Sequence, residues 1–451
     1  MSWMKRFLNS GYVGTLSCIE RRLPFWPVEW IERLQCHRIH SIIRHAYRTV
    51  PFYRRAMDER GLRPEDFQTV DDLTQLPLID SFILRNNLDR FTSTCYDEGS
   101  RQVWYSSGSQ SRAQRTIYWD NASILRELAY AERDRGILNH LIGQSYGQRQ
   151  LYIFPPTSLT LKIRAFWSSQ TLAPRGLAHR QFISIEEPFE AVVEKINTFR
   201  PQVVFSYGSY ADQFFRFLSD RQWRIALPRV WMYGGDLLSP GGRDLIEKTF
   251  GCLVYSAYLS AEAGRIGFQC EYRQGFHLNI DLCAVRLVDE KGRTVPPGEP
   301  GEVVISNLRN LGMVLLNYRQ GDQGILAQKP CPCGRSLPLL EQLSGRCTDV
   351  IRLPNGRELS FLMLEALFKH ELKSTLQSRV IQPAPGQIQW QIVPFSSTDR
   401  KALQNQLLER ARSVLGTDTQ VTVEFVEHIP LTPQGKFLRV MAYPEGAKVK
   451  K

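Results

Sequence analysis

Apolar and polar positions follow two different periods along the chain. Over 1–95 the apolar positions recur every three or four residues, as they do in 28–50, where Ile31, Leu34 and Ile39 fall near one face. This spacing predicts an amphipathic helix, and Pro51 predicts its end because proline cannot continue a helix. The sequence therefore predicts a helical leader over 1–95.

From 100 to 330 short apolar runs alternate with helical stretches. The strand-like runs are 150–155, 202–207, 229–234 and 252–258. The helical stretches are 121–136, 186–198, 209–221 and 239–250. Strands that alternate with helices are typical of mostly parallel sheets covered by helices, so we predict an α/β fold. A β subdomain is expected to follow, because glycine and proline punctuate 282–308 as they do in hairpins.

A smaller α+β unit is predicted at the end of the chain. Its expected elements are a helix over 361–372, a strand over 386–394, a helix over 399–415 and a strand over 420–430. We therefore predict two domains, a large one over 1–345 and a small, mobile one over 346–451, which is within the usual size range of domains.

Composition narrows the class of protein. The 451 residues are 43% hydrophobic and 23% charged, which is ordinary for a globular protein with a large core. Apolar runs are all shorter than the ~18 residues that a membrane span needs, so no span is expected. Nine cysteines, an odd number in a chain this long, do not suggest a disulfide framework and favour a reducing, cytoplasmic setting.

The formal net charge of +12 raises the question of nucleic acid. The basic residues are scattered in pairs such as Arg21 and Arg22 or Arg54 and Arg55, and no basic helix with interleaved aromatic residues occurs. A cationic surface suited to anionic small molecules is therefore the favoured interpretation, and nucleic-acid binding is the weakest.

Five segments carry candidate chemistry. The first, "SSGSQSRA" from Ser106 to Ala113, is a small-residue loop between apolar runs whose backbone N–H groups could wrap a phosphate. It lacks the spacing of a P-loop, so a polar turn between two strands is the alternative.

The second candidate segment is a predicted strand that ends at Gly234 and Gly235, where a flat ring could approach bare backbone. A tight turn with Ser239 as N-cap is the alternative.

The other three segments each offer one charged side chain. Glu262 in "YLSAE" follows a strand end, where open α/β sheets place ligands. Asp322 in "YRQGD" lies in a turn, where a carboxylate can accept two hydrogen bonds from a ribose diol. Lys436 in "PLTPQGK" can be presented to a phosphate at the tip of a loop. Taken singly, each residue is at least as well explained as a solvated surface residue.

Taken in order, the segments resemble the adenylate-forming superfamily of acyl-CoA synthetases and ligases. The chain is most similar to the phenylacetate–CoA ligase-like branch, which includes capsule-biosynthesis-associated members. "SSGSQSRA" resembles T-S-G-[ST]-T-G-[KE]-P, "YLSAE" resembles Y-G-x-[ST]-E, "YRQGD" resembles Y-R-T-G-D, "GRCTD" resembles G-R-x-D-D and "PLTPQGK" resembles P-x-T-x-S-G-K. The resemblance spans almost the whole chain, including the helical leader.

The resemblance implies a role for each matching residue. The loop residues that would cradle the ATP phosphates are Ser106, Ser107, Gly108 and Ser109, with Arg112 supplying charge. The residues that would line the adenine site are Gly234, Gly235, Asp236 and Tyr258. Glu262 would hold Mg²⁺, and Asp322 would bind the ribose hydroxyls with help from Arg346. Lys436 would neutralise charge between the carboxylate and the α-phosphate, and the small domain would pivot near Arg346 to Asp349.

Several positions depart from the family pattern. In the first loop, Gln110, Ser111, Arg112 and Ala113 replace Thr, Gly, Lys and Pro. Elsewhere the departures are Leu259, Ala261, Gln320, Thr348 and Gln434. They make an unusual substrate or reduced activity an open alternative.

A metal site is a further candidate. Cys270 and His277 precede Cys331 and Cys333, and four N/S ligands suit tetrahedral zinc, although C-x-C is tighter than the usual spacing and free structural cysteines are the alternative. The resemblance favours structural zinc, because members of that branch often have similar Cys/His positions.

The resemblance implies an ATP-dependent enzyme that activates a small carboxylic acid as an acyl-adenylate and passes the acyl group to CoA. An amine, a hydroxyl or a carrier-protein thiol is the alternative acceptor, for example in polysaccharide or secondary-metabolite biosynthesis. A non-catalytic nucleotide-binding descendant is an alternative of another class, against which the presence of both Lys436 and Glu262 argues. The identity of the acid is left open, and so is a homodimer.

Overall fold

The computed structural model describes residues 2–106, 115–172, 178–347, 349–432 and 434–442. The chain forms two compact units. Unit 1 comprises Met1–Gln148, Pro156–His179 and Tyr255–Leu343, and unit 2 comprises Arg149–Pro155, Arg180–Val254 and Ser344–Lys451. The predicted domain boundary at 345/346 lies close to the start of the last segment of unit 2 and stays a prediction.

Unit 1 begins with the predicted helical leader. Its helices are α1 (Trp3–Arg22), η1 (Leu23–Phe25), α2 (Val28–Thr49), α3 (Pro51–Asp58), η2 (Pro64–Asp66), η3 (Asp71–Gln75), α4 (Ser81–Asn86), α5 (Leu88–Phe91) and η4 (Glu98–Ser100). The helix α2 buries Ile31, Ile39 and Ile42 as its periodicity predicts, and it ends just before Pro51, which begins α3. Three further helices of this unit follow, α6 (Asn121–Tyr130), α7 (Glu132–Ile142) and α8 (Leu159–Gln170).

Six neighbouring strand pairs of unit 1 are antiparallel. A two-stranded sheet pairs β1 (Arg101–Ser106) with β2 (Arg115–Asp120). A larger sheet has the order β10-β11-β12-β13-β9-β8-β7. Its strands are β7 (Leu253–Ser260), β8 (Gly264–Phe268), β9 (Phe276–Leu278), β10 (Cys283–Val288), β11 (Pro300–Asn307), β12 (Tyr318–Leu326) and β13 (Leu339–Arg346). The predicted β subdomain is present, and the turns that join its strands carry Glu262 and the cysteines.

Unit 2 contains the predicted parallel sheet. Its strands are β3 (Gln148–Ile153), β4 (Ala178–Ile183), β5 (Val203–Ser206) and β6 (Val230–Tyr233). The strands β3, β5 and β6 pair in parallel through α9 (Phe189–Phe199) and α10 (Gly208–Arg221), which are the crossover helices that parallel strands require. After β6 come α11 (Pro240–Asp244), capped by Ser239 as predicted, and the π-helix η5 (Leu245–Phe250). These elements confirm the α/β class.

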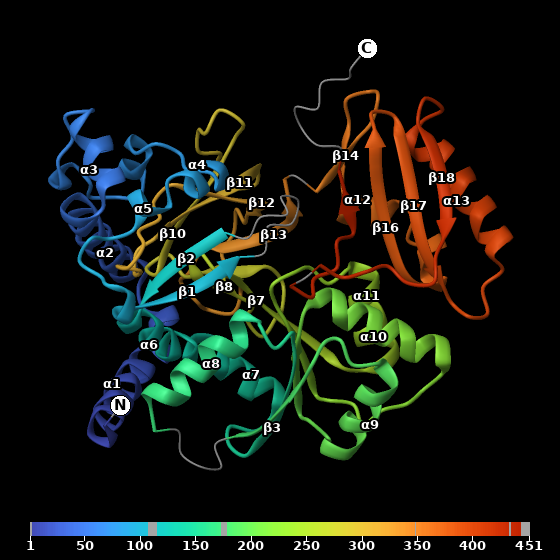
Figure 1. The fold of residues 1–451 in the computed structure, drawn as a ribbon, viewed down its shortest axis with the longest axis horizontal. Helices are drawn as coiled ribbons and strands as arrows, with labels where there is room; N and C mark the ends of the chain where they lie inside the picture. Colours follow the sequence, from blue (N-terminus) through green and yellow to red (C-terminus); the bar gives the residue numbers. More distant parts are fainter. Residues whose placement is uncertain (1, 107–114, 173–177, 348, 433, 443–451) are drawn as a thin grey trace. The chain divides into compact units, whose positions relative to one another are not determined.

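The last part of unit 2 is the predicted α+β segment. Its elements are β14 (Val350–Arg352), β15 (Glu358–Ser360), α12 (Phe361–Leu367), η6 (Glu371–Ser374), β16 (Thr375–Ala384), β17 (Gln387–Pro394), α13 (Arg400–Leu415), β18 (Gln420–Phe425) and β19 (Val440–Met441). The sheet order is β18-β17-β16-β19, and α13 lies along one face of it (Figure 1). Trp390, Leu403 and Leu407 are buried between the helix and the sheet, so this segment has a core of its own.

No helix in the described ranges of the chain is long and apolar enough to cross a membrane.

Candidate functional site

The predicted phosphate loop joins β1 to β2. Ser106 is the last residue of β1 and pairs with Arg115, the first residue of β2. The two strands on either side of the loop are therefore as predicted. Ser107, Gly108, Ser109 and Arg112 lie outside the described residues, so their role in phosphate binding stays a prediction.

The turn that carries Glu262 is held by three side chains from outside it. Three consecutive carbonyl oxygens each accept a hydrogen bond: that of Ala261 from Trp119 Nε1 at 2.8 Å, that of Glu262 from Asn307 Nδ2 at 2.9 Å, and that of Ala263 from Arg309 Nη2. Because each bond fixes one peptide plane, the backbone on both sides of Glu262 is fixed.

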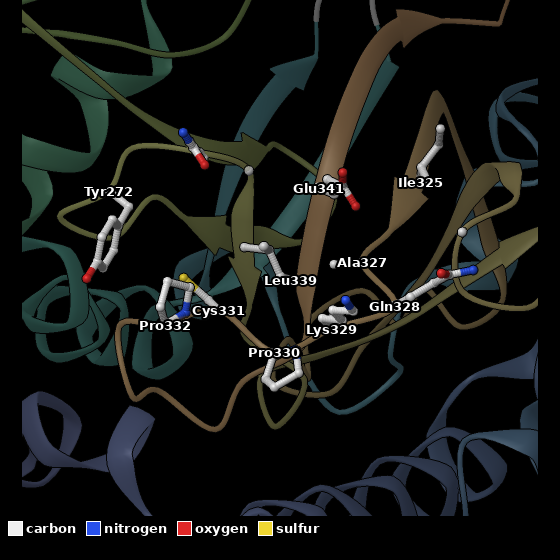
Figure 2. A pocket seen from close by; sticks show the side chains of 13 residues that line it. Tyr272, Ile325, Ala327, Gln328, Lys329, Pro330, Cys331, Pro332, Leu339 and Glu341 are labelled. Carbon is white, nitrogen blue, oxygen red and sulfur yellow. The ribbon is translucent and has the colours of Figure 1, made fainter.

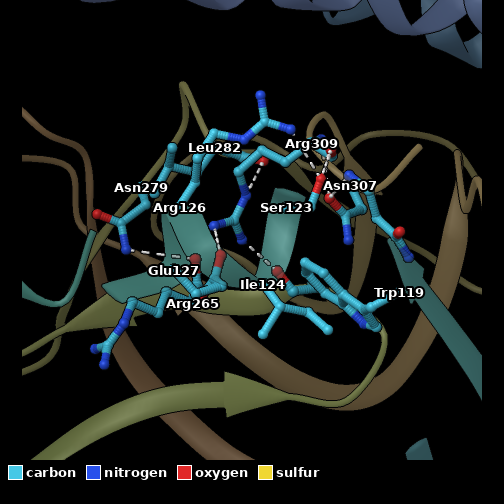
Figure 3. A network of polar contacts seen from close by, with 12 residues as sticks. Trp119, Ser123, Ile124, Arg126, Glu127, Arg265, Asn279, Leu282, Asn307 and Arg309 are labelled. Atoms are coloured by element: carbon cyan, nitrogen blue, oxygen red, sulfur yellow. Dashed lines mark hydrogen bonds and ion pairs between the residues drawn. The ribbon is translucent and has the colours of Figure 1, made fainter. Parts of the chain in front are cut away.

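Arg309 is itself locked in place. Its guanidinium pairs with the buried carboxylate of Glu127 on α6, and its backbone carbonyl accepts a hydrogen bond from Ser123 (Figure 3). Gly264 closes the turn at φ +65°, where a Cβ would lie 3.0 Å from Glu127 Oε2 and 3.1 Å from Arg309 Nη2. A larger residue at this position would have to move the buried ion pair, so the turn requires glycine.

The carboxylate of Glu262 is buried with an unsatisfied oxygen. Its residue is 2% exposed, and Oε1 accepts no hydrogen bond within the described part of the chain. Arg115 Nη2 lies 3.6 Å from that oxygen, while Arg115 Nη1 donates to the Tyr318 hydroxyl at 2.8 Å. A buried carboxylate oxygen without a donor is costly unless a cation or solvent completes it. The position therefore fits an oxygen-preferring cation such as Mg²⁺.

Tyr258 and Asp322 lie together, although 64 residues separate them. The Tyr258 hydroxyl donates a 2.6 Å hydrogen bond to Asp322 Oδ2. Tyr258 is 6% exposed at the end of β7, and Asp322 lies in the middle of β12. The structure places Asp322 within a strand, where the sequence suggested a turn. The bond holds the Asp322 carboxylate in a fixed orientation.

In unit 2, Lys436 reaches the glycine pair that ends β6. Its ammonium donates a hydrogen bond to the carbonyl oxygen of Gly235, and Nζ lies 5.8 Å from the centre of the Tyr207 ring. The Tyr207 hydroxyl in turn donates to the carbonyl oxygen of Gln434 at 3.3 Å. The structure thus brings together two sequence-predicted residues that are 201 positions apart, Gly235 and Lys436.

A tight turn presents Lys436. Gly435 has φ +72° and its N–H donates to the Thr432 carbonyl at 2.8 Å, and Thr432 N–H donates to the Lys436 carbonyl at 2.8 Å. A Cβ on Gly435 would lie 2.5 Å from Pro155 Cγ, so the backbone itself packs against Pro155. Glycine is therefore needed here for conformation and for space.

Asp236 caps a helix rather than pointing freely into a ligand site. Its Oδ1 accepts from the backbone N–H groups of Gly208 and Ser209, at 2.6 and 3.1 Å, and Oδ2 accepts from the Ser209 hydroxyl. Burial raises the pKa of the Asp236 carboxyl, against the effect of these donors and of Lys436. The carboxylate fixes the start of α10 beside the Gly234–Gly235 turn, which is a role that the sequence did not suggest.

A buried network of ion pairs around Asp212 supports the turn that carries Lys436. Arg439 Nη2 and Arg216 Nε both contact Asp212, at 3.0 and 2.6 Å, and the Ser239 hydroxyl donates to the same carboxylate at 2.8 Å. Although burial opposes it, the two guanidinium groups hold the pKa of Asp212 below its usual value. Arg439 is three residues after Lys436, so the network ties the lysine turn to α10.

Arg346 is the last residue of β13, and its carbonyl accepts the N–H of Asp349 at 3.1 Å. Thr348 lies outside the described residues. The predicted pivot and the predicted role of Arg346 at the ribose remain predictions.

The four candidate metal ligands form one cluster in unit 1. The ligand atoms of Cys270, His277, Cys331 and Cys333 all lie within 4.8 Å of one another. His277 Nδ1 lies 3.2 Å from the Leu337 carbonyl oxygen, and His277 Nε2 lies 3.3 Å from Cys333 Sγ. A proton on Nδ1 donated to Leu337 leaves the Nε2 lone pair facing the thiols, which is the usual arrangement around a metal-bound histidine.

The pKa shifts within the cluster differ: burial raises the pKa of the Cys270 and Cys331 thiols, whereas the other two groups shift downward. Burial lowers the pKa of His277, which keeps its imidazole neutral. Burial opposes ionisation of Cys333, but hydrogen bonds from the backbone and side chain of Arg335 outweigh it and lower the pKa of that thiol. The four side chains supply the donor set of a tetrahedral Cys₃His zinc site.

A pocket of about 570 Å³ borders the cluster. Its lining includes Cys331, and Figure 2 shows Tyr272, Pro332 and Cys331 toward one end and Ile325 and Gln328 toward the other. The cluster therefore has a solvent path through which an ion could enter.

The sequence missed the residues that support the site. Arg115, Trp119, Asn307 and Arg309 lie beside or around Glu262, and Asp212 and Arg439 support the Lys436 turn. From the sequence alone, Trp119 has the pattern of a core residue, and the arginines have the pattern of exposed surface cations. The sequence offered one signal for these residues. Arg115 begins the run "RTIYWD", whose apolar and aromatic residues are typical of a buried strand.

The chain is similar to known proteins. A phenylacetate-coenzyme A ligase from Thermus thermophilus is 25% identical over 450 residues, which cover 92% of this chain and 97% of that protein. Residues 352–442 match the family model described as the CapK C-terminal domain. The chain is a homologue of the phenylacetate–CoA ligases and CapK. The resemblance stated from the sequence motifs is thereby confirmed.

A second relative and a solved structure are also similar to the chain. Protein CapK of Staphylococcus aureus is 20% identical, with 89% of this chain and 87% of that protein covered. A crystal structure of 2-hydroxyisobutyryl-CoA ligase, in the postadenylation state with 2-HIB-AMP, matches with a TM-score of 0.77 at 19% identity, covering 94% of this chain and 92% of that chain. The fold is thus that of the adenylate-forming ligases.

Proposed function

We propose that the protein is an acid–CoA ligase that works through an acyl-adenylate. A carboxylate oxygen of the acid attacks the α-phosphorus of ATP, and the bond from that phosphorus to the pyrophosphate oxygen breaks. A CoA thiolate then attacks the acyl carbon, and the bond from that carbon to the AMP oxygen breaks. The thioester and AMP leave.

The observation that carries this proposal is the position of Lys436. A lysine on a tight turn, with its ammonium on the Gly235 carbonyl at the end of a parallel strand, can meet negative charge at that edge. Charge stabilisation by a fixed cation is a main contribution of proteins to transfer at phosphorus. We assign Lys436 to the charge that forms between carboxylate and α-phosphate.

The remaining assignments concern residues of both units, each argued from its own contacts. Asp322, oriented by Tyr258, accepts hydrogen bonds from the ribose diol. Glu262 supplies a carboxylate oxygen to Mg²⁺, which when bound neutralises phosphate charge. Gly234 and Gly235 leave open backbone for the adenine ring, whereas Asp236 keeps that backbone in place. Cys270, His277, Cys331 and Cys333 hold structural zinc.

The acceptor can be tested separately from the activation step. A second candidate keeps the activation step and transfers the acyl group to an amine, hydroxyl or carrier-protein thiol. The cytoplasm, where CoA is available and where cysteines outside disulfides remain reduced, is the proposed location.

Exchange of radiolabelled pyrophosphate into ATP, measured across a panel of carboxylic acids, tests the activation step. Acid-dependent exchange is expected, with some acids strongly preferred. Intact ATP binding without exchange for any acid would favour the non-catalytic descendant instead. For the acids that exchange, CoA consumption compared with trapping by hydroxylamine separates the two acceptors.

A further inference from the structure

The helix α1 has one face that packs against the rest of unit 1. Val13 packs with Leu125 and Ala129 of α6. The side chains of Arg6 and Asn9 donate to the carbonyl groups of Thr171 and Gln170, at 2.8 and 3.0 Å. Figure 1 shows α1 beside α6 and α8, which are the elements that these contacts join. One side of α1 is therefore firmly attached.

The opposite face of α1 is apolar and exposed. Trp3, Phe7 and Leu8 are 64%, 54% and 62% exposed, and the rings of Trp3 and Phe7 stack at 5.5 Å. The same face also exposes Met4, Tyr12 and Ile19. These six large apolar side chains, which are 41% to 64% exposed, lie on about half of the helix circumference and form the kind of patch that marks an interaction surface.

The charge on the exposed side of α1 has one sign. Lys5, Arg21 and Arg22 are exposed, and Arg21 also contacts Glu132. The single carboxylate of α1, that of Glu20, is 3% exposed and pairs with Arg133. The exposed face therefore combines apolar side chains with cations and presents no acidic group of α1.

We propose that this exposed face of α1 binds an anionic lipid surface. A helix with an apolar face, flanking cations and one firmly attached side can lie in the interface of a bilayer, with its apolar side chains among the acyl chains and its cations at the headgroups. At 20 residues α1 spans about 30 Å. The helix lies on the bilayer and does not cross it, and the proposal is independent of the catalytic function.

A second copy of the chain fits this face less well. Paired copies would bring Lys5 and Arg22 of each α1 toward the cations of the other helix, and α1 offers no exposed carboxylate to pair with them. An anionic headgroup layer satisfies both the cations and the apolar residues.

Sedimentation of the full chain with vesicles tests the proposal. Vesicles of phosphatidylcholine with phosphatidylglycerol should sediment the protein, and vesicles of phosphatidylcholine alone should sediment it much less. The variant Trp3→Gln/Phe7→Gln/Leu8→Gln should partition about tenfold less, because the apolar contact is lost. Lys5→Glu/Arg22→Glu should reduce binding to the anionic vesicles in particular.

The matched control changes exposed apolar residues elsewhere in the chain. Phe82→Gln/Tyr146→Gln, at positions that are 68% and 71% exposed, should bind vesicles as the unchanged protein does. Thermal unfolding should be unaltered in all of these variants, since each site is exposed. Protein that stays in the supernatant with anionic vesicles, or a triple variant that binds as the unchanged protein does, overturns the proposal. A dimer in light scattering that the triple variant abolishes, without vesicle binding, would assign the face to a second copy.

Discussion

The hydroxyl of Tyr258 donates a 2.6 Å hydrogen bond to Oδ2 of Asp322. The two residues belong to different strands of the unit 1 sheet, so the bond links the strand end that leads to Glu262 with the carboxylate assigned to the ribose. It orients that carboxylate before any ligand arrives.

Tyr258→Phe is expected to weaken ATP binding. The change removes the donor and keeps the ring, so Asp322 loses its fixed orientation. A hydrogen bond to a charged group contributes about 1.5–3 kcal/mol, so KM for ATP should rise at least about tenfold with kcat changed much less. Pyrophosphate exchange at varied ATP measures both constants. An unchanged KM would show that the bond does not serve the nucleotide.

Lys436→Ala is expected to abolish most acid activation. Loss of one fixed charge-stabilising group costs about 10²–10³ in kcat. Pyrophosphate exchange with the preferred acid is the measurement. The matched control is Lys401→Ala, an exposed lysine on α13, which should leave exchange and thermal unfolding unaltered. Exchange by Lys436→Ala at the unchanged rate would remove the lysine from the mechanism.

Trp119→Phe should alter the magnesium requirement. The variant keeps an aromatic ring and removes the hydrogen bond to the Ala261 carbonyl. An unsatisfied buried carbonyl costs about 1–3 kcal/mol of stability, which urea unfolding can measure. Because the turn also positions Glu262, the Mg²⁺ concentration for half-maximal exchange should rise several-fold, with activity recovering at saturating Mg²⁺. A stability loss with an unchanged Mg²⁺ dependence would confine the tryptophan to a structural role.

Purified protein is expected to contain about one zinc ion per chain, held by the Cys₃His cluster. Cys331→Ser should lower the bound zinc and the melting temperature. Cys95→Ser, at an exposed cysteine outside the cluster, should change neither. Full zinc content in Cys331→Ser, measured by atomic emission, would contradict the ligand set.

Stability at acid pH should depend on Asp281. Although burial acts in the other direction, Arg133 and Arg38 lower the pKa of this buried carboxyl from 3.8 to about 2. A lowered folded-state pKa gives stability that is present above 3.8 and is lost as the pH falls through about 2. This shift corresponds to roughly 2 kcal/mol. The unchanged protein should therefore unfold at a higher urea concentration than Asp281→Asn above pH 3.8, and the difference between the two midpoints should shrink as the pH falls toward 2. A difference that stays constant with pH would contradict the assignment.

The sequence predicted the elements better than it predicted their contacts. The strand 202–207 and the helix 399–415 were found within one or two residues as β5 and α13, because their apolar periods are regular. The proximity of Lys436 to Gly235 has no local signal, since 201 residues separate them, and only the ordered resemblance suggested it.

The supporting residues were missed for a physical reason. Arg309 reads as a surface cation, yet it is 6% exposed because Glu127, from a helix 182 positions earlier, compensates its charge. Trp119 has the alternating pattern of a core residue, and it is buried. That pattern does not predict that its indole N–H donates to the carbonyl of Ala261, next to Glu262. Burial with a specific polar partner is a property of the tertiary structure, which a pattern of polarity does not contain.

The three hydrogen bonds to the carbonyls of residues 261–263 also bear on how this protein can vary. Groups from other elements hold the backbone of the turn, together with the Ser260 hydroxyl, which accepts the N–H of Ala263 at 3.0 Å, and Gly264. Leu259 and Ala261, which depart from the family motif, lie on this turn beside Glu262. Substitutions of these two side chains can therefore change the surroundings of Glu262 while the hydrogen bonds to the carbonyls of residues 261–263, which do not involve those side chains, are kept.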